Sequence, residues 1–209
     1  MAKNQPRSWF IKFWVKLMCK HRHFIIYKPY RFLSQFKSND SKQQKKHFLG
    51  ELHDFPEGTM AIGRLDEKSE GLLFLTTNGQ TSDYINSQKV EKEYYAQVDG
   101  DITLEAIEQL KQGVEIGFNG RKYKTKPCKV FKLDVLPELP ETTQKIRDDR
   151  HGPTSWISVT LNEGKFRQVR KMTSAVGFPT LRLARVRIGD VLVGSMQPGD
   201  VIEVSKLLR

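Results

Sequence analysis

Short apolar runs separated by turn residues recur along the chain, and they predict a fold built mainly from strands. Residues 24–27 are apolar and lead into a proline, which cannot donate to a strand ladder. Residues 72–75 are uniformly apolar and are followed by Asn78-Gly79, as expected of a buried strand. Residues 92–98 and 157–161 alternate between apolar and polar side chains, which indicates strands with two different faces.

Three helices are predicted between these strands. Residues 80–87 form a short candidate, and a second helix follows Thr103, a good N-cap, and ends at Gly113. Residues 166–176 carry apolar side chains at helical spacing, and Gly177 supplies the expected stop.

The remaining segments are turns and loops, with one irregular strand. Asn119-Gly120 is the strongest short hairpin signal in the chain. Residues 37–47 and 137–153 are polar or proline-punctuated and are predicted as surface loops. In the strand predicted at 180–188, the apolar residues change from odd to even positions, which predicts a bulge or bend near Leu183 and Ala184. Because bulges are frequent beside active sites, Leu183 is a candidate site residue. The alternative is an ordinary core leucine. Together these elements predict an α+β fold, with a mixed, mostly antiparallel sheet and two lobes that meet near residue 66.

The net charge of the chain says more about its binding partner than its hydrophobicity does. The 209 residues carry a net charge of +11 and a pI near 9.6, which indicates a polyanionic partner such as nucleic acid. Cys19 and Cys128 are far apart and lie in no metal-ligand spacing, so we expect free thiols, a reducing cytoplasm, and neither a disulfide framework nor a metal site. No apolar run approaches the roughly 20 residues that span a bilayer.

The positive charge is clustered at two places. Residues 1–39 hold nine Lys or Arg and no acid, and residues 8–20 combine aromatic side chains with a lysine at every fourth position. This arm could bind RNA or a membrane surface, and it could equally be a poorly ordered extension, upstream sequence or a transit peptide. Between Glu163 and Asp190 there are seven basic residues and no acid, which favours a surface that contacts phosphates.

Asp66 is the main candidate for chemistry. It lies in the segment 63–79, where a turn runs directly into the predicted buried strand, so a rigid element would hold its carboxylate. The alternative is an ordinary aspartate that caps the turn or pairs with Arg64 on the surface.

Four segments resemble the motifs of RNA pseudouridine synthases. Residues 63–73 (GRLDEKSEGLL) resemble the catalytic motif of that family, and 92–94 (KEY) resemble its Lys-x-Tyr motif. Residues 163–172 (EGKFRQVRKM) and 183–189 (LARVRIG) resemble its third motif and the strand after it. The match covers about residues 24–195 and implies the pseudouridine synthase fold, with a catalytic domain at 23–209 after an extension at 1–22.

Within the family, the chain is most similar to bacterial enzymes that modify ribosomal RNA, on the residues at 27–30, 153–156 and 177–183. This resemblance implies a uridine of 23S ribosomal RNA as the substrate. The reaction breaks the N1–C1′ bond, rotates the base and joins C5 to C1′, without a cofactor or a metal. Because a base in folded RNA cannot be reached in place, the resemblance also implies base flipping.

The resemblance assigns the site residues one by one. Asp66 matches the catalytic carboxylate, which either attacks the sugar or takes a proton from it. Arg170 matches the arginine that pairs with this carboxylate, in a bidentate fork that would orient Asp66 and keep it ionised. Tyr94 matches the tyrosine that stacks on the target base, and Leu183 matches an apolar residue of the uracil pocket.

Four further basic residues are predicted to hold the RNA backbone: Arg64, Lys28, Arg167 and Lys171. Two other functions remain open. One is a ribosomal RNA binder or assembly factor without catalytic activity, and the other is the same reaction on small-subunit RNA or transfer RNA. The intact Asp66, Tyr94 and Arg170 set argues against a pure binder. We expect a monomer, because no extended apolar patch is visible, and the cysteine usage favours a cytoplasmic location.

Overall fold

The computed structural model describes residues 21–43, 45–87 and 90–208. Its strands are β1 (His23–Lys28), β2 (Phe32–Leu33), β3 (His47–Phe48), β4 (Met60–Ile62), β5 (Glu70–Thr76), β6 (Lys92–Asp99), β7 (Glu115–Phe118), β8 (Arg121–Lys124), β9 (Lys129–Leu133), β10 (Thr154–Leu161), β11 (Thr180–Ile188), β12 (Val191–Leu192) and β13 (Val201–Val204). The helices are α2 (Gly79–Asn86), α3 (Leu104–Gln112) and α4 (Gln168–Ala175), with short 3₁₀ turns η1 (Leu49–Glu51) and η2 (Asp149–His151).

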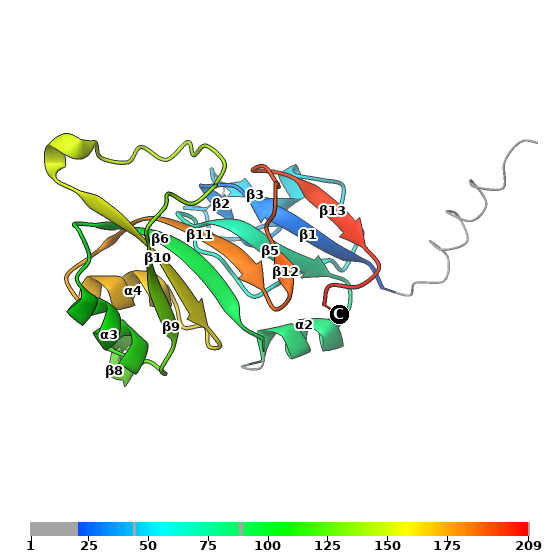
Figure 1. Cartoon of the computed structure of the whole chain (residues 1–209). Helices are drawn as coiled ribbons and strands as arrows, with labels where there is room; N and C mark the ends of the chain where they lie inside the picture. Colours follow the sequence, from blue (N-terminus) through cyan, green and yellow to red (C-terminus); the bar gives the residue numbers. More distant parts are fainter. Residues whose placement is uncertain (1–20, 44, 88–89, 209) are drawn as a thin grey trace, which may run out of the picture.

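One sheet organises the described residues, and nine strands contribute to it (Figure 1). Seven of them follow the order β13-β1-β5-β11-β6-β10-β9, while β4 pairs with β5 and β12 with β11. Within this sheet only β5 and β11 pair in parallel among the described strands, through Ala184 with Glu70 and Arg185 with Gly71. The predicted α+β fold with a mixed, mostly antiparallel sheet is therefore confirmed.

The sheet is covered on both faces, so β5 and β11 lie inside the molecule. On one face, α3 and α4 pack against β6, β10 and β11 through residues such as Ile107, Met172 and Leu183. On the other face, Val186 of β11 packs with Leu139 from the connection between β9 and β10, which runs along that side in Figure 1. Every residue of β5 is buried, as the uniformly apolar run predicted.

Local sequence signals explain where the helices begin and end. The Thr103 side chain accepts a hydrogen bond from the Ala106 amide at 3.2 Å, so it caps α3 as predicted. Asn78 caps α2 by accepting from the Gln80 and Thr81 amides. The third helix is shorter than predicted, because α4 begins only at Gln168.

The predicted bulge in β11 is present but displaced. Register shifts occur between Thr180 and Arg182 and between Arg185 and Arg187, and not at Leu183 and Ala184. Leu183 and Ala184 are both buried because β11 separates two cores, with Leu183 in one and Ala184 in the other. The change of parity therefore reflects a strand covered on both faces, which sequence alone does not distinguish from a bulge.

Gly71 is required where β5 meets β11. Its φ is +100°, and a Cβ atom at this position would lie 2.4 Å from the carbonyl oxygen of Arg185. Only glycine allows the two backbones to approach this closely.

The predicted N-terminal extension at 1–22 lies almost entirely outside the described residues and stays a prediction. The first strand, β1, begins at His23, which is the first residue of the predicted catalytic domain. Cys128 is a free thiol, as expected, and burial raises its pKa to about 11; Cys19 lies outside the described part of the chain. No described helix is long and apolar enough to cross a membrane.

Candidate active site

Asp66 lies on a tight turn immediately before β5. The Ser69 amide donates to the Asp66 carbonyl at 3.0 Å, which closes this turn. The preceding residue is held by the buried Ser34 hydroxyl, which donates to the Leu65 carbonyl at 2.8 Å and accepts from the Leu65 amide at 3.0 Å. The Asp66 backbone is therefore fixed from both sides, as expected for a residue that must hold its side chain still.

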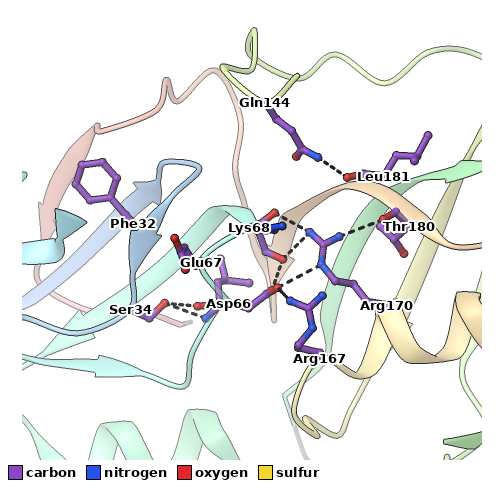
Figure 2. A network of polar contacts seen from close by, with 12 residues as sticks. Phe32, Ser34, Asp66, Glu67, Lys68, Gln144, Arg167, Arg170, Thr180 and Leu181 are labelled. Atoms are coloured by element: carbon purple, nitrogen blue, oxygen red, sulfur yellow. Dashed lines mark hydrogen bonds and ion pairs between the residues drawn. The ribbon is translucent and has the colours of Figure 1, made fainter. Parts of the chain in front are cut away.

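Arg167 and Arg170 contact the Asp66 carboxylate (Figure 2), and the Ser69 hydroxyl contacts it as well. The Oδ2 atom lies 2.5 Å from a terminal nitrogen of Arg167 and 3.3 Å from Nε of Arg170. The Ser69 hydroxyl donates to Oδ1 in a very short hydrogen bond. A carboxylate offers about four lone-pair positions, so these contacts leave room for a reacting atom.

The predicted fork between Arg170 and Asp66 is wrong. Arg170 faces Asp66 only through Nε, which makes an ion pair without a hydrogen bond. Its terminal nitrogens donate instead to the backbone carbonyls of Lys68 at 2.6 Å and Thr180 at 3.2 Å. Arg170 therefore ties the Asp66 turn to the start of β11, and the shortest contact with the carboxylate comes from Arg167.

The α4 helix explains why both guanidinium groups reach one carboxylate. Arg167 is the N-cap of α4 and Arg170 lies in its first turn, and both side chains point toward Asp66 (Figure 2). The Arg170 side chain is only 10% exposed. Burial lowers its pKa, and the negative charge of Asp66 acts in the opposite direction.

Tyr94 and Leu183 come from strands beside this turn. Across the sheet, Gly71, Arg185 and Tyr94 lie in one row on β5, β11 and β6. Two strand spacings of about 4.8 Å place Tyr94 roughly 10 Å from Gly71. Leu183 pairs with Ala96 and is buried in the core that includes α4. The guanidinium of Arg185 lies 6.0 Å from the centre of the Tyr94 ring.

Lys28 does not have the predicted position of a phosphate-binding residue. It is fully buried, and its ammonium group donates to the carbonyls of Pro29 at 2.8 Å and Phe32 at 2.7 Å. Burial lowers the pKa of Lys28 to about 7, against the opposing effects of Asp66, Glu70 and Glu67. The prediction failed because a Lys-Pro pair at the end of a strand gives no sign of which way the lysine turns.

The other basic residues predicted to hold RNA differ in their exposure. Arg64 is exposed, next to the Asp66 turn. Lys171 is half-buried and donates to the Gly117 carbonyl at 2.7 Å. A hollow of about 340 Å³ adjoins the residues that follow Asp66. Its lining combines one acid with several cationic or aromatic side chains, namely Tyr30, Arg31, Lys45, Lys46, His47, Glu67 and Lys68.

Sequence reasoning missed Ser69 and Ser34 as site residues. Ser69 follows Asp66 at a spacing of three, which is typical of a side-chain hydrogen bond across a turn and could have been noticed. Ser34 lies 31 residues before Leu65, and only the folded chain brings the two together. No group of three or more possible metal ligands (His, Cys, Asp or Glu) occurs among the described residues.

A largely buried carboxylate that two arginines contact, in a strongly basic protein, suits an enzyme that acts on nucleic acid. Residues 22–175 match the family model described as RNA pseudouridylate synthase, and the chain belongs to that family. Its enzyme class is therefore RNA pseudouridine synthase, an isomerase.

Among individual proteins, the chain is similar to ribosomal large subunit pseudouridine synthase E from two bacteria. It is 37% identical to the protein of Vibrio parahaemolyticus, over 88% of this chain and 75% of that one. It is 39% identical to the protein of Xanthomonas axonopodis pv. citri, over 83% of this chain and 89% of that one. A crystal structure of a pseudouridylate synthase aligns with a TM-score of 0.68 and 26% identity, over 90% of this chain and 71% of that one.

Proposed function

We propose that this protein converts one uridine of large-subunit (23S) ribosomal RNA to pseudouridine, with Asp66 as the catalytic carboxylate. The observation that carries the proposal is the environment of the Asp66 carboxylate. Its side chain is 17% exposed and contacts two guanidinium groups and a hydroxyl. A protein that only binds RNA has no use for such a carboxylate within a basic surface. The names of the similar bacterial proteins support the large-subunit substrate.

The chemistry needs a carboxylate and a stacking surface. When N1–C1′ breaks, the base rotates and C5 bonds to C1′; C5 then loses its proton and N1 gains one, so no atom is added overall. Asp66 acts on the sugar, either at C1′ as a nucleophile or by removing a proton. The target base must leave the RNA stack, and Tyr94 replaces part of the stacking that is lost. Leu183 contributes an apolar side chain to the pocket that receives the uracil base.

The RNA backbone runs over the exposed cations beside the Asp66 turn. Arg64 and Lys45 are exposed near it, so each contacts a phosphate and releases counterions on binding. Replacing either by alanine should reduce the salt slope of RNA binding by about one. Lys28→Met is the matched control, because a buried ammonium displaces no counterion and the slope should not change.

The deciding experiment is pseudouridine mapping of ribosomal RNA from cells that lack the protein, complemented with wild type, Asp66→Asn or Asp83→Asn. Asp66→Asn preserves shape and removes the charge, so we expect one 23S position to be restored by wild type and by Asp83→Asn alone. Asp83 is an exposed residue of α2 and serves as the matched control.

The other outcomes identify the rival functions. If every 23S, small-subunit and transfer RNA site persists without the protein, it is a binder. If the lost site lies in transfer RNA or small-subunit RNA, the reaction is right and the substrate is wrong. Ribosomal RNA as substrate supports a cytoplasmic location, and light scattering of the purified protein tests the predicted monomer.

A further inference from the structure

A hairpin that stands apart from the main sheet packs against the segment that carries Arg167. The hairpin consists of β7 and β8, and its turn, Asn119-Gly120, has positive φ at both residues (50° and 73°). These values are typical of the tight two-residue turn that the sequence predicted. The hairpin adds no strand to the nine-stranded sheet, and β7 packs beside α4.

Glu163 fastens the hairpin to the segment before α4. It is only 6% exposed, and its carboxylate accepts hydrogen bonds from the Tyr123 hydroxyl at 2.5 Å, the Lys126 amide at 2.9 Å and Gln168 Nε2 at 2.6 Å. Burial raises the pKa of Glu163, but these hydrogen bonds outweigh it and the pKa is lowered. Glu163 therefore joins β8 to α4 as a buried anion whose donors cannot be removed without cost.

Two lysines add contacts between the same elements. The Lys165 ammonium lies 4.9 Å from the centre of the Tyr123 ring and 5.3 Å from that of Phe118, so it is attracted to two aromatic faces. Lys171 donates to the Gly117 carbonyl from the first turn of α4. The hairpin thus contacts residues on both sides of Arg167.

Arg167 itself has an unusual backbone conformation. Its φ and ψ are 53° and 38°, in the left-handed region that a non-glycine residue adopts only when its surroundings impose it. Gln168 brackets this residue, because its side chain accepts from the Lys165 amide at 2.9 Å and donates to Glu163. From this backbone position, the Arg167 guanidinium reaches Asp66 Oδ2 at 2.5 Å.

We propose that Tyr123 is a positioning residue for the reaction, which acts through Glu163 and Gln168 to hold Arg167 against Asp66. The Tyr123 hydroxyl fixes the Glu163 carboxylate, Glu163 fixes the Gln168 amide group, and Gln168 holds the backbone on both sides of Arg167. The hairpin is then part of the catalytic machinery although it contributes no atom to the site. The proposal rests on the proposed function, since its readout is pseudouridine formation.

The test is a double-mutant cycle between Tyr123→Phe and Arg167→Lys. Tyr123→Phe removes only the hydroxyl that donates to Glu163 and keeps the ring, while Arg167→Lys keeps a cation but loses the planar guanidinium. The substrate is 23S ribosomal RNA from cells that lack the protein, with enzyme in excess so that single turnovers are measured. Tyr84→Phe, at an exposed tyrosine of α2, is the matched control.

We expect Tyr123→Phe to lower the single-turnover rate about tenfold, because a small displacement of a reacting group has effects of this size or larger. Its RNA affinity should change less than about twofold, since the hydroxyl points into the protein rather than toward bound RNA. Tyr84→Phe should change neither quantity. In the Arg167→Lys background, Tyr123→Phe should have little further effect, since the group that it positions is already gone.

Two results would overturn the proposal: an unchanged rate in a folded Tyr123→Phe protein, or the same fold-loss in both backgrounds. If Tyr123→Phe does not fold, Gln168→Met interrupts the same connection and is put through the same cycle. Failure of the proposed function is seen separately, as a wild-type protein that forms no pseudouridine in this RNA.

Discussion

The ion pair between Glu70 and Arg182 joins the two halves of the sheet, and breaking it should cost more stability than any surface substitution. Arg182 Nε lies 2.6 Å from Glu70 Oε1, and the two side chains are 10% and 4% exposed. Arg182 also donates to the Pro140 carbonyl at 2.6 Å. The pair lies beside the parallel contact between β5 and β11, which has two registered residue pairs.

The size of the effect follows from burial. Arg182→Met leaves the Glu70 carboxylate without its ion-pair partner inside the protein, and Glu70→Leu leaves the Arg182 guanidinium without a counter-charge, with the Pro140 carbonyl as its remaining acceptor. Removing one partner of a buried pair costs about 3–5 kcal/mol, whereas replacing both by apolar residues is often close to neutral. For a chain of this length, about 2–4 °C of melting temperature corresponds to each kcal/mol, so each single change should lower it by roughly 6–20 °C.

The assay is urea unfolding of the wild type, the two single variants and the double variant Glu70→Leu/Arg182→Met. Trp156 provides a fluorescence signal at the junction, because the Arg182 guanidinium lies 6.0 Å from its ring. We expect the double variant to be more stable than either single variant. Single costs under about 1 kcal/mol, the range of an exposed pair, or costs that simply add, would refute this account of the junction.

Two further predictions concern Gly71 and Lys28. Gly71→Ala should lower the free energy of unfolding by about 2–5 kcal/mol, because positive φ and backbone overlap act together. Gly58→Ala, at φ +80° with open space around it, should lower it by about 1–2 kcal/mol. Thermal unfolding compares the two variants, and equal losses of stability would contradict the close approach of β5 and β11 at Gly71. The pKa of Lys28 is about 7 when folded and about 10.4 when unfolded, so between these values the unfolded state binds more protons and stability rises with pH. Lys28→Met should remove this contribution and make the rise less steep in urea titrations, and an unchanged slope would contradict the buried ammonium.

Much of the fold could be read from local pattern. The uniformly apolar run in β5, the Asn119-Gly120 hairpin and the Thr103 cap each depend on neighbouring residues only, and each is observed as predicted. The β11 strand shows the limit. Its parity change has two explanations that differ only in what covers the strand, and no local signal separates them.

The candidate site divides in the same way. Asp66 stood out because a turn and a buried strand flank it in the sequence. The partners of its carboxylate could not be ranked, since Arg167 and Arg170 lie about a hundred residues away and both belong to the same basic segment.

By itself, then, the sequence determined the kinds of element, the basic surface, the family resemblance and the position of Asp66 before a buried strand. Only the tertiary structure decided that Arg167 makes the shorter contact, that Arg170 donates mainly to backbone carbonyls, and that Lys28 turns inward. The physical reason is that secondary structure and charge depend on residues close in the chain, whereas the direction of a long side chain is decided by burial and by hydrogen-bond partners that folding brings from elsewhere.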